Sequence, residues 1–582
     1  MQGEGYYLGL DLSTQQLKCL AIDGDMQIKH TEVVDFDRDL PHYNTHKGVY
    51  SHGDVVECPV GMWLEAIDLV FEKYKGAGFD LSQVKAISGS CQQHGSVYWK
   101  TGAGDLLQHL NDANGNLVDQ LYPDGFSRKT APNWQDHSTG KQCTQIEKKA
   151  GGPEKLAEIT GSRAHFRFTG PQIMKIAENE EDNYKNTETI SLVSSFLTSI
   201  LCAKLVPIEE ADACGMNIYD IKAKRYDDSL LDVISGKFGK EGLLKKLSGS
   251  VTKCNSPQLM GNIANYFVSK YGFDSECAIY PFTGDNLATI CSLPLEKNDI
   301  LVSLGTSTTI LMVTDQYHPS PNYHLFTHPA IANCYMAMIC YCNGSLAREK
   351  VRDSLNENQS TSWTNFDEAV LDESLDTSGE LAVYFPLGEI VPSVDAITKR
   401  VLYDPKNCEI VKYVDKFDNN RHDAKIIVES QALSARVRVA PLLSGSVDES
   451  NDEKSETMVH FDYDSMKFSE YSSKRPNRVY FVGGASKNDA IVKKFSEVLG
   501  AKNGNFRLET PNSCALGGCF KALWSDLWKK KKIDEKVTFD SFLNRYFPTD
   551  ELEEIKVDDI TKKWEAYKDK IIPLSKLEEE LK

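Results

Sequence analysis

Residues 6–23, YYLGLDLSTQQLKCLAID, decide the fold that we expect for this chain. Apolar residues flank a short polar stretch that begins at Ser13-Thr14, which predicts a strand, a tight turn and a second strand. Residues 300–314, ILVSLGTSTTILMVT, repeat this pattern about half a chain later, again with adjacent hydroxyl residues, Thr306-Ser307, at the turn. Hairpins are common, so the pattern alone leaves an internal duplication and a chance likeness equally open.

The chemistry of these two turns favours a phosphate ligand. Backbone amides of tight turns and Ser or Thr hydroxyls hold phosphate groups well, so two facing hairpins would grip a phosphate chain from both sides. The first hairpin carries an acid, Asp11, where the second has Leu304. One carboxylate is enough to help hold Mg²⁺, because this ion keeps several waters and takes only one or two protein acids.

The length of 582 residues is too great for one hydrophobic core and predicts two large domains. The repeated hairpins place their boundary near residue 293, which gives domains 1–292 and 293–582. The 84 acidic and 65 basic residues leave a net charge of −19, which argues against a general affinity for nucleic acid or an anionic membrane surface. The N-terminus lacks the features of a signal peptide, and the 15 cysteines form no CxxC pair. We therefore expect a cytoplasmic α/β protein with reduced thiols and no membrane span.

The rest of the sequence also predicts a mixture of helices and strands. Residues 479–499 predict a buried strand, a Gly-Gly turn and an amphipathic helix. Residues 141–203 are mostly helical by their period, with predicted breaks at 151–153 and 170–171, while the polar stretch 444–457 predicts a surface loop. The fingerprints of P-loop NTPases, dinucleotide enzymes, zinc proteases, protein kinases and α/β-hydrolases do not occur in the sequence.

Two patches carry side chains that suit a sugar ligand. In Gln92-Gln93-His94-Gly95, a histidine beside amides can donate to and accept from hydroxyl groups; the alternative is a loop histidine held by the backbone. In residues 161–170, GSRAHFRFTG, a guanidinium of Arg163 or Arg167 can face substrate oxygens; the alternative is a surface ion pair.

Two further patches lie where a strand is expected to lead into a helix. In Thr283-Gly284-Asp285-Asn286, the aspartate is either a helix N-cap or a general base for transfer to an alcohol. A helix N-terminus would lower the pKa of this carboxyl and keep it ionised at neutral pH. In residues 483–488, GGASKN, the glycines let the backbone approach a ligand and Asn488 can bind a nucleoside, or the segment simply begins a helix.

Taken in order, these motifs resemble those of the FGGY family of carbohydrate kinases. The strings that carry the resemblance are DLSTQQLKCLAI, DLPHY, SGSCQQHGSVYW, TGSRAHFRFTGPQI, SLVSSFLTSIL, DACGMN, FTGDNLAT, SLGTSTT, CYCNGSLAREK and VGGASKNDAI. The resemblance covers the whole chain and implies two actin-like, ribonuclease-H-like domains with a ligand cleft between them. The strings are most similar to those of fungal-type members that transfer phosphate from ATP, with Mg²⁺, to the C5 hydroxyl of D-xylulose.

The resemblance also implies a role for each matching position. Asp285 would be the catalytic base, and Asp11 would help to hold Mg²⁺. The implied sugar contacts, in the N-terminal domain, are Gln93, His94, Arg167, Asp285 and Asn286. The implied contacts of ATP, mostly in the C-terminal domain, are Ser13, Thr14, Gly305, Thr306, Trp363, Gly483, Gly484 and Asn488.

One string departs from the family pattern. Many bacterial members carry Trp-x-Asp-x-Arg, but Trp134-Gln135-Asp136-His137 is followed by Ser138, so no role is carried over to His137. Two other functions stay open at this point: a kinase for another sugar or polyol, such as ribulose, gluconate or glycerol, and a non-catalytic actin-like ATP sensor. Intact Asp11 and Asp285 argue against the sensor, because a sensor needs no base.

Overall fold

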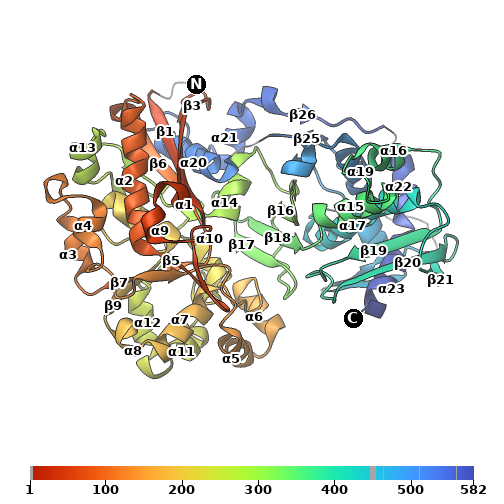
Figure 1. Cartoon of the computed structure of the whole chain (residues 1–582), viewed down its shortest axis with the longest axis horizontal. Helices are drawn as coiled ribbons and strands as arrows, with labels where there is room; N and C mark the ends of the chain where they lie inside the picture. Colours follow the sequence, from red (N-terminus) through yellow and green to blue (C-terminus); the bar gives the residue numbers. More distant parts are fainter. Residues whose placement is uncertain (1–3, 446–453, 463, 510–511, 559, 582) are drawn as a thin grey trace.

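The computed structural model describes residues 4–445, 454–462, 464–509, 512–558 and 560–581. The chain forms two lobes, and each lobe is built on a seven-stranded sheet (Figure 1). Most of the predicted surface loop 444–457 lies outside the described residues.

The first sheet contains the first predicted hairpin at its centre. Its strand order is β12-β13-β6-β1-β2-β3, and β14 also pairs with β6. The strands are β1 (Tyr6–Leu12), β2 (Gln16–Asp23), β3 (Ile28–Asp35), β6 (Val84–Cys91), β12 (Gly261–Asn262), β13 (Ala278–Ile279) and β14 (Thr283–Gly284). β1, β2 and β3 are antiparallel neighbours, whereas β6 runs parallel to β1 and β13 runs parallel to β6. The strand-turn-strand prediction for residues 6–23 is confirmed.

The second sheet repeats this arrangement. Its order is β17-β18-β16-β15-β24-β25-β26. The strands are β15 (Ile300–Leu304), β16 (Thr308–Thr314), β17 (His324–Thr327), β18 (Tyr335–Tyr341), β24 (Val479–Val482), β25 (Asn505–Arg507) and β26 (Glu553–Glu554). Again three antiparallel neighbours, β15, β16 and β18, adjoin two parallel ones, β24 and β25. Both hairpins thus occupy the same place in equivalent sheets, which favours duplication over a chance likeness.

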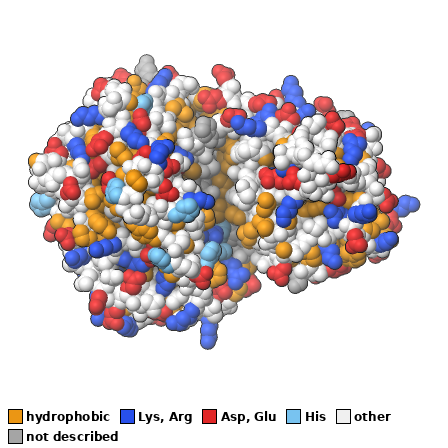
Figure 2. Space-filling view, in the orientation of Figure 1, with side chains coloured by type: hydrophobic (Ala, Val, Ile, Leu, Met, Phe, Trp, Pro, Cys, Tyr) orange, Lys and Arg blue, Asp and Glu red, His pale blue; other side chains and the backbone are white. Residues whose placement is uncertain are grey.

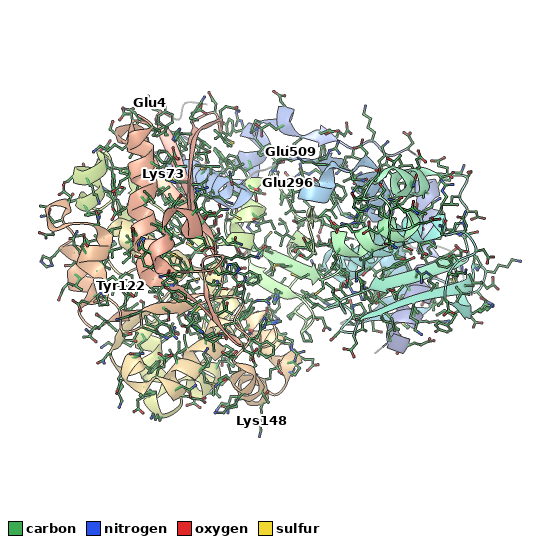
Figure 3. All side chains as sticks on the ribbon, viewed as in Figure 1. Glu4, Lys73, Tyr122, Lys148, Glu296 and Glu509 are labelled. Atoms are coloured by element: carbon green, nitrogen blue, oxygen red, sulfur yellow. The ribbon has the colours of Figure 1, made fainter. Side chains whose placement is uncertain are left out.

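Helices cover the faces of both sheets. In the first lobe, α2 (Val60–Gly76) packs on β2 and β3, and Lys73, labelled in Figure 3, donates to Asp39 at 2.8 Å. In the second lobe, α17 (Arg421–Val439) packs against α19 (Asp489–Leu499), which follows β24 as predicted. Further elements of this lobe are α15 (Ser345–Leu355), α16 (Thr364–Leu371), α23 (Ile571–Leu581) and a three-stranded sheet of β19 (Glu380–Phe385), β20 (Ile397–Asp404) and β21 (Glu409–Val414).

The helical prediction for residues 141–203 is partly wrong. α5 (Gly140–Ala150) and α6 (Pro153–Thr160) are separated at Gly151-Gly152 as expected. Gly170-Pro171, however, lies in the first turn of α7 (Thr169–Asn179), where a proline removes only an amide that has no partner within the helix. A strand, β9 (Thr187–Leu192), then precedes α9 (Val193–Cys202).

Helix α20 (Ser513–Lys529) joins the end of the chain to the first sheet. It packs on β1 and β6, although it follows β25 of the second sheet in the sequence. Glycines make the contact close: a Cβ on Gly9 would lie 1.9 Å from the carbonyl oxygen of Ala515, and one on Gly518 would lie 2.5 Å from the Cα of Gly89. No side chain fits at Gly9 or Gly518 without a backbone shift.

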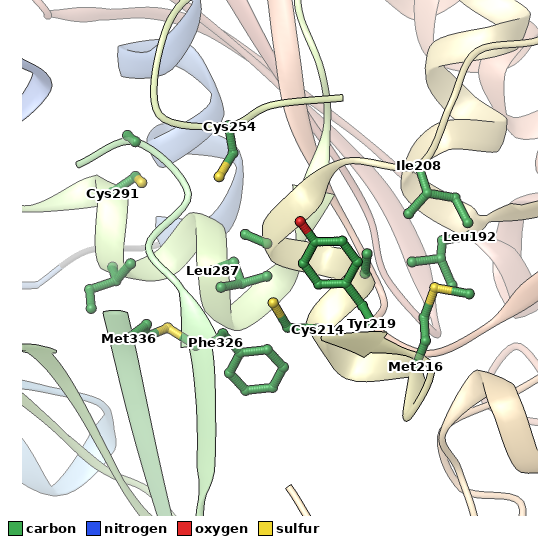
Figure 4. Close-up of a cluster of buried hydrophobic side chains, with 14 of the residues drawn as sticks. Leu192, Ile208, Cys214, Met216, Tyr219, Cys254, Leu287, Cys291, Phe326 and Met336 are labelled. Carbon is green, nitrogen blue, oxygen red and sulfur yellow. The ribbon is translucent and has the colours of Figure 1, made fainter. Parts of the chain in front are cut away.

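Apolar side chains from both halves of the chain form one core where the lobes meet. Figure 4 shows Leu287 of α14 (Asp285–Thr289), Phe326 of β17 and Met336 of β18 gathered near Cys214. Each lobe also has an apolar core of its own. In the part of the chain that the structure describes, no helix combines the length and the hydropathy needed to cross a membrane.

Replacing Gly9 by Ala should destabilise the protein by about 2–3 kcal/mol, because the methyl group forces α20 away from β1. Gly242→Ala is the matched control, since no atom lies within 4 Å of a Cβ at that helical position. The control should leave stability equal or raise it by up to about 1 kcal/mol. Urea unfolding of both variants checks this; equal effects would contradict the close helix–sheet contact.

Candidate active site

A groove separates the two lobes, and Figure 2 shows it as a hollow between them. Many of the predicted site residues lie on turns at the ends of strands of the two sheets, whereas Arg167, Trp363 and Asn488 lie at or near the starts of helices.

The first hairpin carries the buried carboxylate of Asp11. Ser90, on the neighbouring strand β6, donates to its Oδ1 at 2.8 Å, while no described residue donates to the other oxygen. Burial raises the pKa of Asp11, although the hydrogen bond from Ser90 and the charge of Lys18 act against this. At the turn, Ser13 donates its amide and its hydroxyl to the carbonyl oxygen of Gln16, and the Thr14 hydroxyl accepts from Trp134 at 2.8 Å.

The second hairpin exposes its turn next to the start of α15. Thr306 is exposed and Gly305 is half-buried. The carbonyl groups of both residues accept from the amides of Gly344 and Ser345, at 3.1 and 3.0 Å. A Cβ on Gly344 would lie 2.6 Å from the Ser307 carbonyl carbon, so this glycine, which the sequence analysis missed, is required for the close approach.

The turn after β24 lies directly beside the second hairpin. Gly483 has a φ of +90°, and a Cβ there would lie 2.9 Å from the carbonyl oxygen of Leu304. Gly483 and Gly484 are both exposed, which leaves their backbone accessible. The chain thus brings Gly305, Gly483 and Gly484 together.

Asn488 and Trp363 lie near this turn, at the ends of α19 and α16. Asn488 caps α19, accepting from the amide of Ile491 at 3.0 Å, and its amide nitrogen donates to Asp367 of α16 at 2.7 Å. Trp363 precedes the first residue of α16, and the guanidinium of Arg352 lies 4.6 Å from its ring centroid. Asn488 therefore caps α19, and its side chain links α19 to α16.

Asp285 is the first residue of α14, and Gly284 rather than Asp285 is the N-cap. Its Oδ1 accepts from the backbone amide and the side chain of Asn286, at 2.7 and 3.1 Å. Burial, and then the negative charge of Asp11, raise the pKa of Asp285 to about 7. The expectation of a lowered pKa is wrong, because α14 spans only five residues and its N-terminus cannot offset desolvation and a neighbouring carboxylate.

The loop with Gln93 and His94 packs on this turn. A Cβ on Gly284 would lie 2.3 Å from Gln93 Cγ, and Asn286 donates to Gln93 Oε1 at 3.5 Å. His94 is buried with its ring stacked on Phe168, 4.3 Å between centroids, and its Nδ1 bonds to the Gly215 carbonyl oxygen at 2.9 Å. Since a carbonyl only accepts, Nδ1 carries the proton and Nε2 is an acceptor. Burial, then the charge of Arg167, lower the pKa of His94 to about 3, so the imidazole is neutral.

The two arginines of residues 161–170 have different surroundings. Arg163 is exposed and pairs with Glu147 at 3.2 Å, so the surface ion pair is the right interpretation for it. Arg167 is half-buried, and its Nη2 lies 3.3 Å from Nε2 of His324 on β17. Burial lowers the pKa of Arg167, while Cys340 and Asp285 act in the opposite direction. Arg167 therefore faces the same region as Asp285 and His94.

Several residues of this region were missed at the sequence level. His324 and His165 lie with ring centroids 4.7 Å apart, next to Arg167. Behind the Asp285 turn, the buried Glu209 accepts from the Thr283 hydroxyl at 3.0 Å and from the amide of Asp212 at 2.9 Å. The two adjacent acids in VPIEEADA, an otherwise apolar string, were the available signal for Glu209.

Asp136 lies in the string that departs from the family pattern, and its carboxylate links three neighbouring segments. It is fully buried and accepts from Val56, Gln172 and Ser138 at 2.6–3.1 Å, and these hydrogen bonds outweigh burial and lower its pKa. His137 is exposed, in line with the absence of a carried-over role. Among the described residues, no group of three or more His, Cys, Asp or Glu side chains is placed to hold a metal ion.

Asp285→Asn should stabilise the protein, because the amide cannot carry the negative charge that burial and Asp11 disfavour. The pKa of Asp285 is about 7 in the folded state, above its ordinary value of 3.8. The wild-type protein therefore loses stability as the pH rises from the lower of these pKa values to the higher, because the carboxyl ionises more readily in the unfolded state. The advantage of the variant should therefore grow between pH 5 and 7 and level off above, at about 1–3 kcal/mol. Urea unfolding at several pH values measures it; a gain independent of pH would contradict the raised pKa.

Comparison with known proteins shows relatives of the whole chain. The model of the N-terminal domain of the FGGY family of carbohydrate kinases matches residues 129–291, and that of the C-terminal domain matches residues 300–525. The xylulose kinase of Saccharomyces cerevisiae is 59% identical over 100% of this chain and 97% of its own length. That of Schizosaccharomyces pombe is 44% identical over 91% of each chain. The crystal structure of xylulose kinase from Rhodospirillum rubrum matches 99% of both chains with a TM-score of 0.72 at 14% identity, and the expected α/β fold with two actin-like domains is confirmed.

Proposed function

The chain belongs to the FGGY family of carbohydrate kinases, and we propose that it transfers the γ-phosphoryl group of ATP to the C5 hydroxyl of D-xylulose. The observation that carries this proposal is that the turn of Asp285 packs on the loop of His94, whose ring stacks on Phe168 next to Arg167. The choice of D-xylulose rests on the names of the relatives that match the whole chain. The 1–292 domain would bind the sugar and the 293–582 domain the nucleotide.

In this proposal the sugar lies against Gln93, His94, Arg167 and Asn286. The neutral His94 offers an acceptor nitrogen to a hydroxyl, and Arg167 offers donors to sugar oxygens. The Asp285 carboxylate takes the proton of the C5 hydroxyl. At the same time the hydroxyl oxygen attacks the γ-phosphorus, and the bond to the leaving ADP breaks. A pKa of about 7 suits this role, because about half of the carboxylates are ionised at neutral pH and the group is basic enough to accept the proton.

ATP would be bound by the turns of the second lobe and by the first hairpin. The exposed backbone of Thr306, Gly483 and Gly484 suits the phosphates and the adenosine. The other proposed contacts on this side are Gly305, Asn488 and Trp363. Ser13 and Thr14, on the first hairpin, would face the transferred phosphate. Mg²⁺ would be held by Asp11, whose second oxygen takes no hydrogen bond from a described residue, and it would neutralise charge on the phosphates. A cytoplasmic location agrees with the 15 free cysteines.

A substrate panel with an ADP-coupled assay tests the proposal. D-Xylulose should give a kcat/KM at least roughly tenfold above ribulose, gluconate and glycerol, because correctly placed hydrogen bonds discriminate between acceptors. Without an acceptor, or with Mg²⁺ chelated, ADP release should fall to background. A strong preference for another acceptor would identify a different sugar kinase, and ADP release that no acceptor stimulates would favour the ATP sensor.

A further inference from the structure

A buried histidine from the second lobe reaches the sugar side of the site. His324, the first residue of β17, is 5% exposed. Its Nδ1 lies 3.0 Å from the Ser162 hydroxyl, and its Nε2 lies 3.3 Å from Nη2 of Arg167. Both partners belong to the segment that joins α6 to α7 in the first lobe, so one imidazole links the two halves of the chain.

The chemistry of these partners determines the protonation of His324. A guanidinium has only donors, so Nε2 must accept from Arg167, and Nδ1 must carry the proton and donate to Ser162. Burial, and then the neighbouring His165, Arg167 and His94, lower the pKa of His324 well below its usual value. The ring is therefore neutral and has one fixed tautomer, with its acceptor nitrogen facing Arg167.

The contact leaves most of the binding capacity of Arg167 free. Among the described residues, no carboxylate lies within ion-pair distance of this guanidinium, and Nε2 of His324 is its one hydrogen-bond partner. A neutral acceptor orients the guanidinium through one N–H and leaves its charge and its other donors for a ligand. A carboxylate in the same place would have neutralised that charge.

The backbone fixes His324 in this place. The amide of Leu325 donates to the carbonyl oxygen of Gly161 at 2.9 Å, and a Cβ on Gly161 would lie 2.0 Å from the Leu325 carbonyl oxygen. Only glycine permits this approach of β17 to the first lobe. The position of His324 relative to Arg167 is thus set by main-chain contacts on both sides.

We propose that His324 is a positioning residue that orients the guanidinium of Arg167 toward the hydroxyl groups of the sugar, so that the second lobe completes the sugar pocket of the first. This inference rests on the proposed function, in which Arg167 contacts the sugar. It predicts an effect on sugar binding and none on ATP binding.

Two variants of His324 separate positioning from packing. His324→Leu removes the acceptor and should raise the KM for D-xylulose about tenfold, the loss expected for one hydrogen bond to a charged group, with the KM for ATP within about twofold. His324→Gln keeps an acceptor oxygen and should recover most of this loss. His318→Leu, at a half-buried position before β17 where the ring contacts Asp464 rather than Arg167, is the control and should match the wild-type protein.

A double-mutant cycle shows whether His324 acts through Arg167. In an Arg167→Ala background, His324→Leu should add less than about a twofold further increase in sugar KM, because the group that it orients is missing. Full additivity, a Gln variant as impaired as the Leu variant, or an unchanged sugar KM in His324→Leu would each overturn the inference. The proposed function fails separately, if the wild-type protein shows no sugar-dependent ADP release.

Discussion

The packing of α20 against β1 and β6 is the constraint on which the rest of the structure depends. Gly9, Gly89 and Gly518 let helix and sheet approach to main-chain contact, so α20, from the C-terminal half of the chain, packs on the strands that carry Asp11 and Ser90. α14 lies against the same helix, and the Thr289 hydroxyl is 3.2 Å from the sulfur of Cys514. One helix therefore positions both acids of the site. Because its sequence lies far from either acid, the site forms only when the two halves of the chain have folded together.

The electrostatics of the site follow from this packing. Two carboxylates, Asp11 and Asp285, share a poorly hydrated region, and their mutual repulsion adds to the cost of burial. The protein tolerates this because the apolar core shared by the lobes holds the turn in place. The net charge of −19 is no obstacle to an anionic ligand, since turn amides, hydroxyls and the uncompensated Arg167 provide local donors.

Much of this arrangement was predictable from the sequence, because it depends on local patterns. Alternating apolar residues and hydroxyl pairs predicted both hairpins, and Gly483 and Gly484 predicted a turn that the backbone could use for close approach. The contact of α20 with the first sheet was not predictable, since a helical period does not indicate which sheet the helix covers. His324 was missed because Ser162 and Arg167 lie far from it in the sequence, and Glu209 because Thr283, which it holds, lies 74 residues away. The sign of the Asp285 pKa shift depends on Asp11 and on burial, which only the tertiary structure supplies.

The central claim is that Asp285 is the base of a sugar kinase. Asp285→Asn and Asp285→Ala should lower the kcat for D-xylulose about 10²–10⁴-fold, the usual contribution of a general base, while ATP affinity measured by calorimetry stays nearly unchanged. Near-normal turnover in either folded variant would contradict this account.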